Sequence, residues 1–267
     1  MRKKSISAWF KKTFLVFYAV FLLQYDTLLQ TVLPGFTYTN SSEIITEPKQ
    51  IPLLLKDNGI NQRVLSFGNI DPLSSYWITL CADLPDNNKP ARIHVKDETG
   101  HVFLILTKVL SGDADSIHQV FGFYPHRPAS GIIFKNVRSQ IIGNGTREYN
   151  ISVSKKLSAE IFQLVLEQAV ISSKHRYNLN KYNCYNYAID VFNAIPGIEK
   201  IPISKVRFPF ILGKGGSPCA LFKDLIHLKE NPSYWSDYIK TGIFLAPANT
   251  PANKTTTKKD WTRISLK

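Results

Sequence analysis

The chain has 267 residues, of which 44% are hydrophobic and 12% aromatic. This length and composition exclude a wholly disordered protein and favour one sizeable core with extensions. The formal net charge of +13 favours anionic surroundings such as a wall polymer or a membrane surface. A specific nucleic-acid partner is not predicted, because no recognisable nucleic-acid motif accompanies the charge.

The first 36 residues have the layout of an export segment. Residues 1–12 are basic, and the uninterrupted apolar run Phe14–Leu23 has the length of a signal-peptide core rather than of a membrane span. We predict a signal peptide or N-terminal anchor over residues 1–36, and a secreted or cell-envelope location. No small-residue cleavage site follows, so a cleaved signal, a retained anchor and a buried core helix stay open. Without this segment, 28 basic and 19 acidic residues leave a net charge of +9.

Composition divides the rest of the chain into three parts. Residues 37–75 are polar and turn-rich, which predicts a linker or small appendage. Residues 76–230 carry the strand and helix patterns of a domain. Residues 231–267 end in a lysine-bearing stretch rich in Thr, Pro and Ala, which predicts a basic, solvated tail.

The domain begins with a series of strand patterns. Runs rich in β-branched and aromatic residues, bounded by turn signals, occupy residues 76–82, 101–109, 117–124, 131–135 and 148–153. A turn signal at residues 111–115 separates the second run from the third. The pattern predicts an antiparallel sheet.

Three helix patterns follow the strands, which makes the expected class α+β. The first begins after Ser158 as N-cap, the second begins at Cys184, and the third has Ser217 as N-cap and Pro218 at its first position. The glycines just before Ser217 lack the Gly-Lys-Ser/Thr spacing of a phosphate loop. We therefore predict no nucleotide cofactor.

The helix pattern at Cys184 carries the clearest chemical signal. Apolar residues recur at helical spacing after the cysteine, and Asn180 and Asn183 are N-cap candidates. Free amides and the positive end of the helix dipole at such a position favour a thiolate, which is the nucleophilic form of cysteine. The alternative is a buried helix cysteine that serves as a small hydrophobic residue.

A histidine at the start of a strand is the candidate base. His101 precedes the apolar run 102–106, and imidazole titrates in the range needed to accept a thiol proton. If the hairpin turns near residues 112 and 113, the position opposite His101 is close to Tyr124. Tyr124 and the neighbouring His126 are therefore the candidates for a third residue that orients the imidazole. The alternative for His101 is a strand-edge histidine without a role.

Three cysteines in an exported chain leave at least one thiol unpaired. If Cys184 is free, only Cys81 and Cys219 can form a disulfide, and the sequence does not decide whether they do. The lack of a Cys-x-x-Cys or His/Cys cluster argues against a structural zinc site.

Four short motifs in this order resemble the circularly permuted branch of the papain-like superfamily. They are Gly100-His-Val-Phe103, Val120-Phe-Gly-Phe-Tyr-Pro125, Tyr182-Asn-Cys-Tyr-Asn-Tyr-Ala-Ile-Asp190 and Gly215-Gly-Ser-Pro-Cys-Ala-Leu221. That branch includes NlpC-type cell-wall peptidases and lecithin:retinol acyltransferase relatives, and the motifs are closest to bacterial secreted or toxin-linked members.

The resemblance covers about residues 76–229 and implies an antiparallel sheet packed against helices, with the catalytic cysteine at a helix N-terminus. It implies a cysteine peptidase or amidase in which Cys184 is the nucleophile and His101 the base, and it implies no cofactor. The favoured substrate is an amide bond in a cell-wall peptide. Because the superfamily hosts several reactions, an acyltransferase or lipid-ester hydrolase and a non-catalytic surface-binding module remain alternatives. The second histidine of the acyltransferase relatives is missing, since Asp113 stands at that position.

Overall fold

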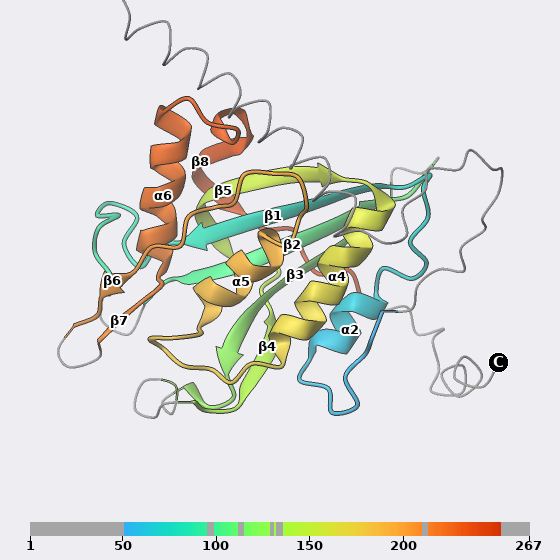
Figure 1. Cartoon of the computed structure of the whole chain (residues 1–267), viewed down its shortest axis with the longest axis horizontal. Helices are drawn as coiled ribbons and strands as arrows, with labels where there is room; N and C mark the ends of the chain where they lie inside the picture. Colours follow the sequence, from blue (N-terminus) through green and yellow to red (C-terminus); the bar gives the residue numbers. More distant parts are fainter. Residues whose placement is uncertain are drawn as a thin grey trace, which may run out of the picture. The chain divides into compact units, whose positions relative to one another are not determined.

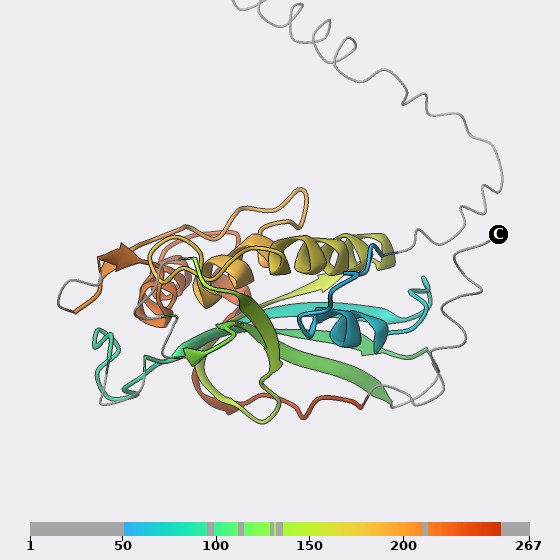
Figure 2. The same ribbon diagram turned by 90° about the horizontal axis from the view of Figure 1, so that it is seen from below.

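The computed structural model describes residues 51–94, 99–111, 115–128, 131, 136–209 and 213–251. These residues form an α+β fold in two layers, with a six-stranded antiparallel sheet and helices packed against one of its faces (Figures 1 and 2). The strand order is β4-β3-β2-β1-β5-β8. The expected class and the antiparallel sheet packed against helices are therefore confirmed.

The bounds of the elements are as follows. The strands are β1 (Ser75–Asp83), β2 (His101–Val109), β3 (Ser116–Pro125), β4 (Ser139–Gly143), β5 (Glu148–Leu157) and β8 (Ile239–Leu245). A separate two-stranded ribbon consists of β6 (Val206–Arg207) and β7 (Lys214–Gly215). The helices are α2 (Ile60–Leu65), α4 (Ala159–Ser173), α5 (Cys184–Phe192), α6 (Pro218–Glu230) and the short 3-10 helix η1 (Ser236–Tyr238).

Most predicted elements occur where the sequence places them. The strand patterns at 76–82, 101–109, 117–124 and 148–153 correspond to β1, β2, β3 and β5. The side chains of Ser158 and Ser217 cap α4 and α6 by accepting hydrogen bonds from the amides of Ile161 and Ala220. Pro218 occupies the first turn of α6, where its missing amide hydrogen is not needed.

The main core lies between the helices and one face of the sheet. Strand residues of alternate parity point into it, for example Ile78, Leu80 and Ala82 on β1, because successive side chains of a strand point to opposite faces. A smaller cluster on the other face contains Cys81, Phe103, Ile105, Val120 and Ala246. Residues 101–106 of β2 are thus buried on both faces, whereas the second face of β1 is buried only at Cys81.

The prediction of a tail from residue 231 is wrong for residues 231–251, since Trp235 is fully buried in the main core and β8 follows it. Strand β8 pairs with β5, and the residues after it lie along the part of β3 that β4 does not reach. There the Asn249 side chain accepts from the Val120 amide at 2.6 Å, and the Thr250 amide donates to the His118 carbonyl at 2.9 Å. Ala246 belongs to the cluster on that face. Residues 252–267 lie outside the described residues.

Two further boundaries differ from the prediction. The segment 37–75 is not only a linker, because Ile60 and Val64 of α2 and the following Phe67 are buried in the main core. The predicted strand at 131–135 is described only at Gly131, which is helical, while β4 begins eight residues later. The predicted export segment, residues 1–36, lies outside the described residues. Within the described part of the chain, no helix is both long and apolar enough for a membrane span.

Candidate active site around Cys184 and His101

Cys184 is the first residue of α5, as the sequence predicts. Asn183 is the N-cap, and its side-chain oxygen accepts from the Tyr185 amide at 2.9 Å. The Asn186 side chain accepts in return from the Asn183 amide at 3.2 Å, which completes a capping box. The Asn183 amide group also donates to two loop carbonyls, so the start of the helix is held in place.

The sulfur of Cys184 lies against the first residues of β2. Burial raises the pKa of the thiol, and the backbone amides of Val102, Tyr185 and Cys184 itself, with the charge of Arg147, oppose that rise. The sequence led us to expect a thiolate favoured by the helix terminus. That expectation is wrong for the structure as it stands, because the loss of hydration outweighs the stabilisation by amide groups.

His101 is the first residue of β2, and only 4% of it is exposed. Burial, and secondarily the charge of Arg147, lower the pKa of the imidazole well below its usual value. A methyl group at Gly122 would overlap His101 Nε2 and lie 3.0 Å from Cε1. Position 122 therefore admits the imidazole only because it has no side chain.

Asn144 is the site residue that the sequence analysis missed. Its oxygen Oδ1 lies 2.8 Å from the point where a Gly122 Cβ would be, and His101 Nε2 lies closer still to that point. Both atoms are buried and have no hydrogen-bond partner. The Asn144 nitrogen donates to the Tyr124 hydroxyl at 2.5 Å, which fixes the oxygen toward the imidazole.

Tyr124 lies beside His101, in the register that the sequence predicts. The pairs run from Leu104 with Phe121 to Val109 with Ser116, and the same register continued places Tyr124 opposite His101. The two rings stack, with centroids 4.2 Å apart and planes 22° from parallel. Tyr124 therefore packs on the face of the imidazole, and the polar atom that lies beside Gly122 together with Nε2 is Asn144 Oδ1.

His126 is not brought to the imidazole. It follows β3 as an exposed residue, and its amide donates to the Arg138 carbonyl at 2.7 Å. The expectation that Tyr124 or His126 would meet the distal nitrogen of His101 is therefore corrected. Asn144 was missed because it follows β4, which the sequence analysis did not identify.

An ion pair lies next to these groups. Arg147 donates to Asp83 through Nε at 2.8 Å and Nη2 at 2.6 Å, and the pair joins the turn after β4 to the end of β1. The charge of Arg147 lowers the pKa of both His101 and Cys184. It therefore opposes a charged imidazole and favours a thiolate.

Cys184 and His101 approach the start of β2 from its two faces. Cys184 packs against the main core on the helix-covered face. The His101 ring is nearly parallel to that of Phe103, two residues later on the opposite face, with centroids 6.2 Å apart. The ladder between β2 and β3 begins only at Leu104, so β3 does not pair with β2 at this end. His101 Nε2 is buried without a hydrogen-bond partner, so this nitrogen does not bond to the thiol.

The other two cysteines are buried and form no disulfide. Cys81 and Cys219 are free and buried, so the disulfide that the sequence left open is not formed. The Cys219 thiol donates to the Arg92 carbonyl at 3.1 Å. In the described part of the chain, no group of three or more His, Cys, Asp or Glu side chains is arranged to hold a metal ion.

Comparison with known proteins returned no relative. No protein-family model matches the chain, and neither a curated protein nor a solved structure matches it.

Proposed function

We propose that the protein is a thiol hydrolase of the permuted papain-like type that cleaves an amide bond, with Cys184 as nucleophile and His101 as base. The observation that carries the proposal is the position of the Cys184 sulfur at the capped start of α5, against the amide of the residue that follows His101. The imidazole is buried and neutral, which leaves one ring nitrogen able to accept a proton, while burial and the charge of Arg147 lower its pKa.

In this mechanism His101 Nδ1 takes the thiol proton as the Cys184 sulfur bonds to the substrate carbonyl carbon. The imidazolium then gives the proton to the leaving amine as the carbon–nitrogen bond breaks. Water attacks the thioester, with the imidazole again accepting a proton, and the thiol and a carboxylic acid are released. The backbone amides of Cys184 and Val102 are the donors that we assign to the oxyanion.

The imidazole and the sulfur must come together during this reaction. The first residues of β2 are paired with the end of β1, and β3 pairs with β2 only from Leu104 onward, so the approach of the two groups requires the His101 side chain to change its orientation. Catalytic contacts are often long in unliganded enzymes. A hydrogen bond from Nε2 to Asn144 Oδ1 would hold the proton on Nε2 and leave Nδ1 free to accept.

The favoured substrate is a peptide of the bacterial cell wall. Its support is the layout of residues 1–36, which predicts export, together with the net positive charge that remains without them. Lipid acyl transfer is less favoured, because Asp113 replaces the second histidine of the acyltransferase relatives.

Turnover of cell-wall peptides, with the products identified by mass spectrometry, tests the proposal. We expect hydrolysis by the wild-type chain and a loss of at least about a hundredfold in both Cys184→Ser and His101→Gln. Cys219→Ser, which removes a thiol that donates to the Arg92 carbonyl, is the matched control and should retain activity. Equal turnover by Cys184→Ser and Cys219→Ser would refute a nucleophilic role for Cys184.

A second candidate function is a non-catalytic surface-binding module on the same scaffold. The observation that favours it is the approach of Cys184 and His101 to β2 from opposite faces, with a thiol whose pKa burial raises. Such a module would bind wall fragments equally well with and without the Cys184 thiol.

A further inference from the structure

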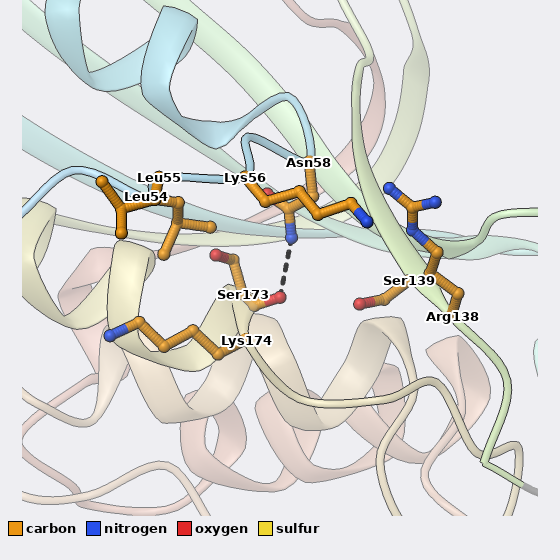
Figure 3. A pocket seen from close by; sticks show the side chains of 8 residues that line it. All are labelled: Leu54, Leu55, Lys56, Asn58, Arg138, Ser139, Ser173 and Lys174. Carbon is orange, nitrogen blue, oxygen red and sulfur yellow. Dashed lines mark hydrogen bonds between the residues drawn. The ribbon is translucent and has the colours of Figure 1, made fainter.

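A depression of about 320 Å³ lies on a part of the surface that shares no residue with the Cys184 site. It lies between the segment before α2, the start of β4 and the end of α4 (Figure 3). Its lining residues are Leu54, Leu55, Lys56, Asn58, Arg138, Ser139, Ser173 and Lys174. The lining thus contains three cations and no carboxylate.

Hydrogen bonds fix the walls of this depression. The Asn58 side chain donates to the Ser173 carbonyl at 2.8 Å, and the Asn58 carbonyl accepts from the Ile141 amide at 2.7 Å. The Ser139 hydroxyl donates to the His175 carbonyl at 2.6 Å. The segment before α2 is therefore tied both to β4 and to the end of α4, which makes the depression a stable feature.

The cations of the depression have no acidic partner. No ion pair among the described residues involves Lys56, Arg138 or Lys174. The neighbouring Asp57 is engaged elsewhere, since its Oδ1 accepts from the amides of Gly59 and Asn61 at the start of α2. In Figure 3 the Lys56 ammonium points toward the Arg138 guanidinium. Two like charges directed at one another favour an anion between them.

One buried acceptor in the wall also lacks a partner. Asn58 Oδ1 is buried without a hydrogen-bond donor, and the bond from the Asn58 nitrogen to Ser173 keeps the amide in that orientation. An unsatisfied buried acceptor costs free energy that a donor would recover. Lys56, which lines the same depression, is exposed.

We propose that this depression binds a phosphate group that carries a proton, either hydrogen phosphate or the singly protonated form of a phosphate monoester. Arg138 supplies the forked donor that matches phosphate oxygens, and Lys56 supplies a point charge beside it, whereas the Lys174 ammonium points away from both in Figure 3. The P–OH group donates to Asn58 Oδ1. Leu54 and Leu55 line the same depression and offer an apolar surface to the organic part of a monoester. The proposal does not depend on any activity of Cys184.

Calorimetric titration of the full chain with inorganic phosphate and with sulfate, at equal ionic strength and pH 7, tests the site. We expect saturable phosphate binding and roughly tenfold weaker sulfate binding, because sulfate has no proton to donate to Asn58. Arg138→Gln and Lys56→Gln should each weaken phosphate binding by roughly tenfold. Lys240→Gln removes the same charge from β8, at the opposite edge of the sheet, and should leave the affinity unchanged.

Vesicles distinguish the two sources of such a monoester. Cosedimentation with phosphatidic acid vesicles, but not with phosphatidylglycerol vesicles of equal charge, would identify a lipid headgroup. Phosphate binding without cosedimentation would identify a soluble ligand. Equal affinities for phosphate and sulfate, or equal effects of Arg138→Gln and Lys240→Gln, would overturn the proposal, and so would the absence of saturable binding.

Discussion

At the scale of single residues, the site depends on one glycine more than on any charged group. Gly122 has no side chain, and the imidazole of His101 occupies the space that a Cβ atom would take. Asn144 Oδ1 lies beside the same position. The sequence predicted no role for this glycine, because Val120-Phe-Gly-Phe stood out only as part of a motif. Its contact with the imidazole became evident only from the fold.

Gly122→Ala should displace the imidazole, because the new methyl group overlaps Nε2. We expect a loss of about 1–3 kcal/mol in the free energy of unfolding, as for other overpacked sites, measured by chemical denaturation. The same substitution in a His101→Ala background should cost less, since the overlapping ring is gone. If the two costs are equal, the imidazole does not occupy the space above Gly122 in solution.

At the scale of elements, the sequence predicted the strands and helices with strong periodic patterns and clear caps. Strand β2 begins and ends at the predicted residues, and α6 begins at the predicted proline. The hairpin register was predictable as well, because one turn signal fixes the pairing of two strands. From these local signals the sequence correctly predicted Cys184 at the start of a helix and His101 at the start of a strand.

Short and interrupted elements were not predictable. Strand β4 has only five residues, and Gly242 interrupts β8, with a φ of 148°. Both are edge strands, whose pairing depends on partners distant in the sequence. Asn144 was missed for the same reason, since it reaches His101 only after β4 has paired with β3. The face of β2 on which His101 lies could not be predicted either, because it is defined only by how the sheet packs against the helices.

The C-terminal segment is an integral part of the sheet, which a pair of truncations can test. A chain that ends at Tyr238 loses β8 and exposes the cluster around Cys81 and Val120. We expect it to unfold at a lower temperature and to expose Cys81 to alkylating reagents. A chain that ends at Pro251 keeps the described contacts of this segment and should melt like the full chain. Equal melting temperatures for the two truncations would show that residues 239–251 are dispensable.

At the scale of the whole molecule, buried groups with shifted pKa values set a range of pH for greatest stability. Burial lowers the pKa of His101, so the unfolded chain binds more protons below about pH 6.5 and stability falls as the pH drops. Burial raises the pKa of Cys81 and Cys184, so the unfolded chain loses protons first above about pH 8.5. Stability should therefore fall on both sides of this interval.

The contribution of His101 to this profile can be isolated. Between its folded and unfolded pKa values, one histidine changes the free energy of unfolding by up to about 1.4 kcal/mol per pH unit. Burial also lowers the pKa of His118, which acts in the same direction. We expect His101→Gln to reduce the slope of the free energy of unfolding against pH below about pH 6.5. His118→Gln should reduce that slope further. If His101→Gln leaves this slope unchanged, the imidazole is not buried and neutral in the folded chain.

The most direct test of the proposed thiol chemistry is the rate of Cys184 alkylation as a function of pH, in wild-type and His101→Gln chains. Peptide mapping identifies the alkylated cysteine. If His101 accepts the thiol proton, the wild-type rate at pH 7 should exceed the variant rate by at least about tenfold. The variant should then react appreciably only well above pH 8.5, where the buried thiol ionises without help. Identical profiles for the two chains would contradict the account and leave the surface-binding module as the function.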